Sequence, residues 1–318
     1  MLEFQFPPNL NNGFNNCEDA MISSVVYNGA SRYECLHALY WGMRYFAPSP
    51  ERKSLNDRFY ISGLFRLDNA ILKELFGLEF CERRSENRDA FWDEVCRRLD
   101  EGQATVLRMD TFDCPWNVGY RNYHRQHFVI VTGVGERGVL VCHDPFCKVQ
   151  SGRLPLDALA TGSIDFFHYS FQSPTNPCSN ERLLHKMARA YLEQEFSDDI
   201  RGLAEELREY DLYREVKDIP FDSICLAPFF IQLRGIVSSR SNLIDFVAVL
   251  CARLRTVAKP AFERLAESWN VVYCVLIKAM TRGGGRQYME QAADLLLQIA
   301  LEEQALAAEL VQAAEETI

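Results

Sequence analysis

Short apolar runs separated by glycines and polar residues mark the chain up to about residue 175, and this pattern predicts β-strands. Four runs fit strands, at 105–109, 127–132, 138–142 and 163–169. The second and third runs are joined by a short segment with three glycines, Gly133, Gly135 and Gly138, which predicts a hairpin turn. We therefore expect an antiparallel sheet in this part of the chain.

Two helices are also predicted before residue 175. Asn16 comes just before an apolar-periodic stretch, so we expect a helix that is capped at Asn15 or Asn16 and ends at Asn28-Gly29. Residues 88–100 carry apolar side chains on one helical face, and Gly102 ends this second helix.

Beyond residue 175 nearly the whole sequence follows a helical period. Five amphipathic helices are predicted, at 179–195, 198–216, 242–257, 259–280 and 286–315. Pro260 would lie in the first turn of the fourth helix, and Gly283-Gly284-Gly285 would separate it from the fifth. Prolines in 173–177 predict a linker. The expected organisation is a catalytic α+β domain over residues 1–172, followed by an all-α domain, a helical bundle, over 178–318.

Charge and cysteine content narrow the function classes. The 44 acidic and 34 basic residues give a net charge of −10, which argues against nucleic acid or an anionic membrane surface as the main partner. No run approaches the roughly 18 apolar residues of a membrane span. The 11 cysteines are odd in number, and the polar start of the chain is unlike a signal peptide. We therefore expect reduced thiols in a cytoplasmic protein.

Cys17 stands at the start of the first predicted helix. The N–H groups and the positive dipole end of a helix favour thiolate over thiol, and a thiolate is the working nucleophile of acyl chemistry. The same N–H groups can hold the oxyanion of a tetrahedral intermediate. The plainer alternative is a buried thiol in a helix cap, which is the commoner situation for a lone cysteine.

A second candidate element lies at the ends of the predicted hairpin. His127 opens one strand, and Asp144-Pro145 directly follows the other. Antiparallel strands joined by a short turn place these ends side by side, so Asp144 can accept a hydrogen bond from His127 and fix its tautomer. The alternative is a purely structural hydrogen bond at the strand ends. Cys17, His127 and Asp144 are the predicted catalytic residues.

The sequence supports a catalytic or metal-binding role less strongly for other residues near these strands. His124 would face the site if the strand began later, and His143 points to the opposite side of an extended chain from Asp144. A zinc set could be drawn from Cys114, Cys142, His143 and Cys147. Its spacing lacks a second ligand pair, so we expect no metal site.

Residues flanking the catalytic candidates could line a substrate site. Asn11 and Asn16 precede Cys17 and could donate to an oxyanion, although an asparagine-rich loop is also simply a turn. Asp110, Trp116 and Tyr123 belong to a long aromatic loop, which suits substrate contact or packing on itself.

Three segments resemble a known family. They are Asn16-Cys-Glu-Asp-Ala20, Asp110-Thr-Phe-Asp-Cys-Pro-Trp116, and the stretch from Tyr123-His-Arg-Gln-His-Phe-Val-Ile-Val-Thr-Gly133 through His143-Asp144-Pro145. Together they are similar to the butirosin biosynthesis protein H group, acyltransferases and related enzymes of natural-product clusters. The order Cys, His, Asp is that of papain-like enzymes. The His-strand-Gly and Asp-Pro pattern also resembles the peptidase domains of bacteriocin exporters, which usually show Asp-Cys-Gly where this chain has Asn-Cys-Glu. The resemblance covers roughly residues 14–170.

The resemblance implies a papain-like fold and acyl transfer in the biosynthesis of secondary metabolites such as antibiotics, of the nonribosomal peptide or polyketide type. An acyl, aminoacyl or peptidyl group would pass from the phosphopantetheine thioester of a carrier protein through Cys17 to a small-molecule amine, with no cofactor bound to the chain itself. Two alternatives stay open: a cysteine hydrolase, either peptidase or thioesterase, with the same triad, and an inactive papain-fold adaptor. The long final helix is compatible with a homo-oligomer.

Overall fold

A computed structural model describes residues 1–8, 16–62, 69–136, 138–159, 162–174, 178–217, 224–225, 227–281 and 285–318. The chain divides into two compact units. A sheet unit comprises Met1–Tyr33 and Leu67–Pro177, and a helical unit comprises Glu34–Arg66 and Cys178–Ile318. The second boundary falls at the predicted linker, but Glu34–Arg66 belong to the helical unit, whereas the sequence analysis had placed them in the first domain.

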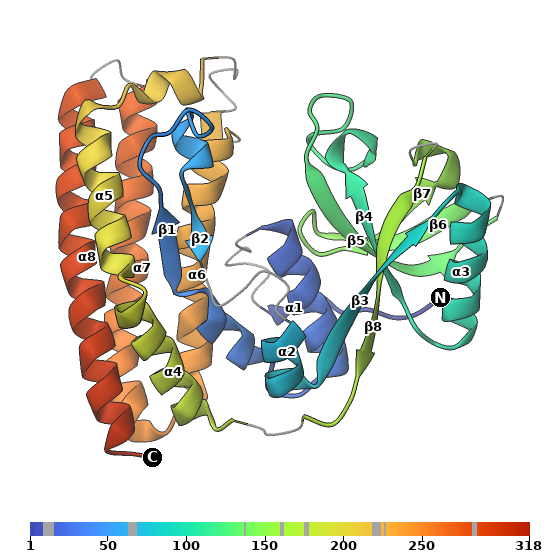
Figure 1. Cartoon of the computed structure of the whole chain (residues 1–318), viewed down its shortest axis with the longest axis horizontal. Coiled ribbons are helices and arrows are strands. Elements are labelled where there is room, and N and C mark those ends of the chain that lie inside the picture. The colour runs from blue at the N-terminus through green and yellow to red at the C-terminus, as the bar shows by residue number, and fades with distance from the viewer. Residues whose placement is uncertain are drawn as a thin grey trace. The chain divides into compact units, whose positions relative to one another are not determined.

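An antiparallel sheet forms the centre of the sheet unit (Figure 1). Within the described residues its six strands run in the order β3-β8-β4-β5-β6-β7. Their bounds are β3 Leu78–Ser85, β4 Thr105–Asp110, β5 Gln126–Val134, β6 Val139–Asp144, β7 Val149–Pro155 and β8 Ile164–Phe171. The four predicted strands correspond to β4, β5, β6 and β8, whereas β3 and β7 were not predicted.

The α-helices in the described part of this unit are α1 Cys17–Gly29, α2 Asn69–Phe76 and α3 Arg88–Asp100. The predictions of α1 and α3 are confirmed. Helix α3 buries Phe91 and Val95 in a core shared with Leu107, Val129 and Phe166 of the sheet. Apolar side chains removed from water in this way supply the main driving force that holds a helix on a sheet. Short 3-10 turns occur at Thr111–Asp113 and Leu156–Ala158.

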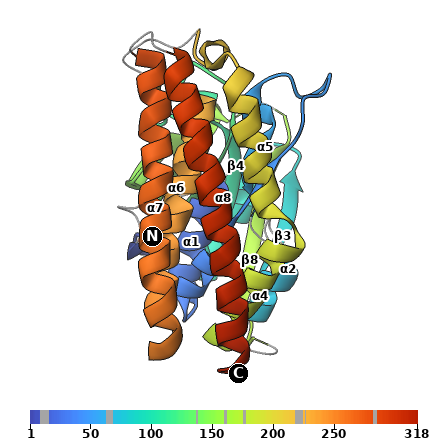
Figure 2. The same cartoon turned by 90° about the vertical axis from the view of Figure 1, so that its left-hand side faces the viewer.

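The helical unit is a bundle of long helices. They are α4 Asn180–Glu193, α5 Phe196–Glu209, α6 Pro228–Ala248, α7 Ala252–Thr281 and α8 Gly285–Glu315. Helix α8 packs against α4, α5 and α7, and the view of Figure 2 shows α7 and α8 running side by side. No helix in the described part of the chain combines the length and the apolar character needed to cross a membrane.

Several helix boundaries differ from the sequence prediction. The predicted helix 198–216 is too long, because α5 ends at Glu209. The predicted helix 242–257 is wrong, because it spans the end of α6 at Ala248 and the start of α7 at Ala252. Residues 259–280 are helical as predicted, but their helix begins earlier, at Ala252. Pro260 therefore lies inside α7 rather than in its first turn. An interior proline removes one backbone hydrogen bond, and here buried neighbours such as Phe262 and Leu265 hold the helix together. The predicted break at Gly283-Gly284-Gly285 lies mostly outside the described residues, although α8 begins at Gly285.

Glu34–Arg66 is the N-terminal segment of the helical unit. Within it, β1 Gly42–Tyr45 pairs with β2 Phe59–Ser62 in a small hairpin. Short 3-10 turns at Tyr33–Tyr40 and Leu55–Asp57 flank these strands, and another occurs at Leu212–Glu215. Arg44 pairs with Asp199 of α5 at 3.1 Å, and Arg58 pairs with Glu206 of α5 at 2.7 Å. Tyr45 donates to the same Glu206 at 2.9 Å. These bonds and the packing around them explain why this segment belongs to the helical unit.

His37 makes the helical unit sensitive to acid. Its side chain is buried, and burial lowers its pKa to about 3. In the unfolded chain its pKa is about 6.5, so the unfolded state binds the proton first. The stabilisation that comes from a neutral, buried His37 is therefore fully present above about pH 6.5, and it is lost as the pH drops towards 3. In urea titrations at successive pH values, His37→Gln should lose less stability on acidification than wild type. Identical curves for wild type and His37→Gln would contradict the assignment.

Candidate active site

Cys17 is the first residue of α1. The Asn16 side chain caps this helix, because its Oδ1 accepts from the Asp19 N–H at 2.8 Å. Cys17 is half-buried, and its Sγ lies 3.5 Å from the carbonyl oxygen of Gln126, the first residue of β5. The start of the helix therefore lies against the start of the strand that carries His127.

His127 and Asp144 form the buried centre of the site. His127 Nε2 lies 2.7 Å from Asp144 Oδ2, and the side chains are 1% and 0% exposed. The hairpin brings them together as its geometry predicts, with Ile130 of β5 paired to His143 of β6. The pairing register of β6 with β7 shifts between Cys142 and Asp144, where β6 ends.

Asp144 is held by two further donors. Trp116 Nε1 donates to Oδ2 at 2.7 Å, and the Cys147 backbone N–H donates to Oδ1 at 3.0 Å. Burial alone would raise the pKa of Asp144, but these bonds and His127 outweigh it and hold the pKa below its usual value. Asp144 is therefore a carboxylate that accepts the Nε2 proton of His127.

The acid–base state of His127 follows from the same contacts. Burial lowers its pKa, but the hydrogen bonds to Asp144 and to neighbouring thiols raise the pKa well above the ordinary value. Those thiols belong to Cys114, Cys147 and Cys17. Since Asp144 occupies Nε2, Nδ1 is the ring nitrogen available to a thiol. His127 is thereby suited to take and return a proton at Cys17.

Two of the predicted lining residues form a pair on the surface. His124 Nδ1 lies 2.9 Å from Asp110 Oδ2, and the His124 ring stacks on Phe112 with centroids 4.5 Å apart. Asp110 also accepts from the Phe112 N–H at 2.9 Å. The His124 side chain is 72% exposed, so it is not part of the buried centre. Asp110 and His124 hold the start and the end of the loop together.

The other lining candidates have different positions. Trp116 supports Asp144 and packs on Gly152 of β7, where a Cβ would lie 2.7 Å from the indole. Tyr123 is partly exposed, and its ring lies under the guanidinium group of Arg125. Asn16 uses its Oδ1 as a helix cap, and Asn11 lies outside the described residues.

The sequence pattern suggests Cys114 and Cys147 only as members of a zinc set that its spacing disfavours, and it does not predict that they lie beside His127 and Asp144. Two residues separate Asp144 from Cys147, and a turn of this length brings the two side chains together. The sequence therefore contained a signal for this pair. His143 was correctly separated from the centre: its Nε2 lies 3.0 Å from Ser24 Oγ, and its ring lies 4.7 Å from that of Phe6, centroid to centroid.

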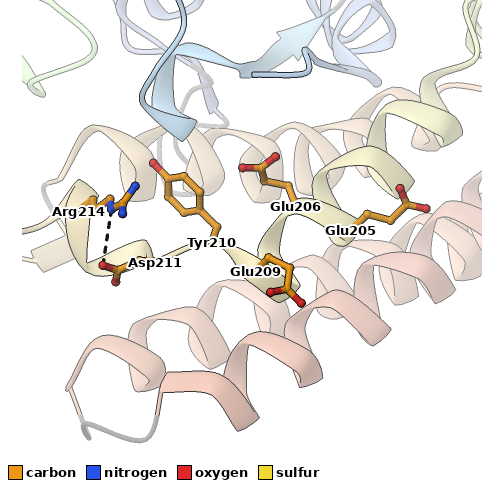
Figure 3. Close-up of a pocket in the computed structure, with 6 residues that line it drawn as sticks. All are labelled: Glu205, Glu206, Glu209, Tyr210, Asp211 and Arg214. Atoms are coloured by element: carbon orange, nitrogen blue, oxygen red, sulfur yellow. Dashed lines mark ion pairs between the residues drawn. The ribbon is translucent and has the colours of Figure 1, made fainter. Parts of the chain in front are cut away.

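A separate hollow of about 410 Å³ lies in the helical unit (Figure 3). It is lined by Glu205, Glu206, Glu209, Tyr210, Asp211 and Arg214. Two of its acids are already paired, because Glu206 binds Arg58 and Asp211 lies 3.7 Å from Arg214. Since Glu206 and Asp211 already have structural partners, we assign this hollow no catalytic role.

No protein-family model and no curated protein sequence matches this chain.

Proposed function

We propose that this chain is a cysteine-dependent acyltransferase of papain-like fold, in which Cys17 carries the acyl group. The observation that carries the proposal is the position of His127. Its Nε2 binds the buried Asp144 at 2.7 Å, and the Cys17 Sγ lies 3.5 Å from the carbonyl oxygen of Gln126, the residue directly before His127. A nucleophile, a base and a group that orients the base are the parts such chemistry needs.

The transfer proceeds in two steps. His127 takes the Cys17 proton, and the thiolate attacks the donor thioester, so that a new S–C bond forms while the donor C–S bond breaks. The released donor thiolate takes the proton from His127. An amine then attacks acyl-Cys17, its nitrogen bonds to the carbonyl carbon, His127 takes the amine proton, and Cys17 leaves as thiolate.

The helix start supports the charged intermediate of both steps. Asn16 Oδ1 already occupies the Asp19 N–H, so the Cys17 N–H, one position inside the positive end of α1, is the proposed oxyanion donor. The asparagines at 11, 12 and 15 lie outside the described residues.

A carrier-protein thioester is the proposed donor, as the resemblance implies. The loop after β4 supports a macromolecular donor, because its surface combines apolar and cationic groups. Val118 is 63% exposed, and Tyr120 and Tyr123 are 38% and 36% exposed. The guanidinium groups of Arg121 and Arg125 lie over the rings of these two tyrosines. Carrier proteins are commonly acidic, and such a patch would attract one despite the negative net charge of the chain.

Intact-mass measurement tests the proposal. Wild type is incubated with a carrier protein that bears an acyl-phosphopantetheine arm, and it should gain the mass of the acyl group. Cys17→Ala should gain nothing, while Cys81→Ala, which removes an exposed thiol on β3, should behave as wild type. A gain that persists in Cys17→Ala would overturn the proposal.

Addition of an amine then separates transfer from hydrolysis. The acyltransferase releases the acyl group as an amide faster than as a free acid. Release as acid alone, at a rate the amine does not change, would identify a thioester hydrolase with the same triad.

A further inference from the structure

Two thiols that the proposed acyl transfer does not use lie beside the His127–Asp144 pair. The donor atoms of Cys114, His127 and Asp144 all lie within 4.8 Å of one another, and all three residues are buried. Cys147 is half-buried and adjoins this group, because its backbone N–H donates to Asp144 Oδ1 at 3.0 Å. With Cys147, this neighbourhood offers two sulfur donors, one nitrogen and one oxygen.

We propose that Cys114, Cys147, His127 and Asp144 form a binding site for a thiophilic divalent ion of the Zn²⁺ class. This ion takes four tetrahedral ligands drawn from Cys, His and carboxylate side chains. The Asp144 and Cys147 ligands come from one tight turn, as the 3.0 Å bond from the Cys147 N–H to Asp144 Oδ1 shows. The sequence predicts no metal site, because the spacing of Cys114, Cys142, His143 and Cys147 lacks a second ligand pair; the proposed site keeps the two cysteines Cys114 and Cys147 and takes His127 and Asp144 as its other ligands.

The surroundings of these donors match what a metal site requires. Asn117 Nδ2 donates to Cys147 Sγ at 3.4 Å, and the Asn117 side chain is itself fixed by the Gly119 N–H at 2.9 Å. Trp116 Nε1 holds Asp144 Oδ2. Outer hydrogen bonds of this kind orient metal ligands, and a donor to sulfur favours the thiolate that the metal binds.

Binding needs a small rearrangement and an exchange of protons. Zinc bonds of about 2.0 to 2.3 Å in a tetrahedron put donor atoms roughly 3.2 to 3.8 Å apart. Donor pairs as far apart as 4.8 Å must therefore close by about 1 Å, and the 2.7 Å pair of His127 Nε2 and Asp144 Oδ2 must open by about 0.5 Å. The metal takes the place of the proton on His127 Nε2, the ring keeps its proton on Nδ1, and the two thiols release theirs to solvent.

One consequence rests on the proposed function. With Nδ1 protonated and Asp144 bound to metal, His127 can no longer take a proton from Cys17. Metal occupancy and acyl transfer then exclude each other, so Zn²⁺ would inhibit the enzyme and a chelator would restore it. Metal binding itself does not depend on acyl transfer.

Cobalt absorption spectroscopy tests the site. Full-length protein stripped with a chelator is titrated with Co²⁺, and wild type should bind one ion with the intense visible and sulfur-to-cobalt bands of tetrahedral thiolate coordination. Zn²⁺ should then remove these bands. Cys114→Ala and Cys147→Ala should each weaken binding at least about tenfold, since each removes a ligand. Cys17→Ala and Cys81→Ala should keep the wild-type spectrum.

The outcomes separate this proposal from the previous one. Absence of a thiolate–cobalt band in wild type, or a band that survives in both Cys114→Ala and Cys147→Ala, would overturn the site. Loss of the band in Cys17→Ala would also overturn the assignment of these two thiols. Far-UV circular dichroism of each variant shows that the fold is kept, and the half-buried Cys147 is the position where truncation disturbs packing less. If the intact-mass test with the acylated carrier fails while the cobalt bands are present, only the proposed acyltransferase activity is overturned, and the metal site stands.

Discussion

Replacement of Asp144 by asparagine is expected to slow acylation of Cys17 by a factor of about 10² to 10⁴. The carboxylate accepts the Nε2 proton of His127 at 2.7 Å, and this leaves Nδ1 unprotonated for Cys17. An asparagine amide that donates to Nε2 instead would favour the tautomer with its proton on Nδ1. His127 would then be unable to accept the thiol proton. Single-turnover acylation by a carrier thioester, followed by intact mass, measures the rate.

The pH dependence distinguishes this role from a loss of folding. The hydrogen bond to Asp144 is the largest of the contributions that raise the pKa of His127, against the lowering effect of burial. Without the carboxylate the pKa of His127 should fall, so the limb of the pH–rate profile that reports His127 should move to lower pH. A merely structural defect would lower the rate at every pH and leave that limb in place.

Trp116→Phe tests the role of the same carboxylate, with a smaller expected effect than Asp144→Asn. It keeps an aromatic side chain at this position and removes the Nε1 donor to Asp144, together with part of the indole that packs on Gly152. A hydrogen bond to a charged group contributes about 1.5 to 3 kcal/mol, so we expect a loss of at least about tenfold, below that of Asp144→Asn. An unchanged acylation rate in Asp144→Asn would contradict the role assigned to the carboxylate.

The part of the site that sequence could predict is the part made by neighbouring strands. His127 and Asp144 meet because a hairpin brings its outer ends together, and hairpins have readable turn signals. The cap at Asn16 before Cys17 was also predictable, because an asparagine directly before an apolar-periodic stretch is a local signal for the start of a helix. Cys114 could not be placed, because its approach to His127 depends on how the loop after β4 folds back. Long-range loop packing leaves no period in the sequence.

The elements of the fold also divide into those that a local sequence pattern predicts and those that it does not. Strand β3 was missed because it runs at the sheet edge with Glu82, Arg83 and Arg84 exposed, so its sequence lacks the apolar run of a central strand. Strand β7, at the other edge, carries polar exposed positions and Gly152. The pairing of Arg58 with Glu206 spans 148 positions and could not be read from a local pattern.

Glu303→Gln is expected to destabilise the helical unit by about 3 to 5 kcal/mol. Glu303 of α8 and Arg240 of α6 form a two-pronged ion pair, with bonds of 2.9 and 3.0 Å and both side chains 0% exposed. Trp269 of α7 also donates to Glu303 at 2.8 Å, so one carboxylate joins three helices. Glutamine keeps the shape but leaves the Arg240 charge buried without a counter-ion. The free energy of unfolding in urea measures the loss.

Two matched variants test whether the uncompensated charge is the cause. Glu290→Gln breaks an exposed pair on the same helix, with Arg286 at 3.1 Å, and should change stability by less than about 0.5 kcal/mol. Arg240→Met combined with Glu303→Leu removes both charges and fills the space with apolar atoms. Because the desolvation penalty disappears along with the attraction, the double variant should be far more stable than Glu303→Gln and close to wild type. A double variant as unstable as Glu303→Gln would mean that shape and the Trp269 hydrogen bond, rather than charge, hold these three helices together.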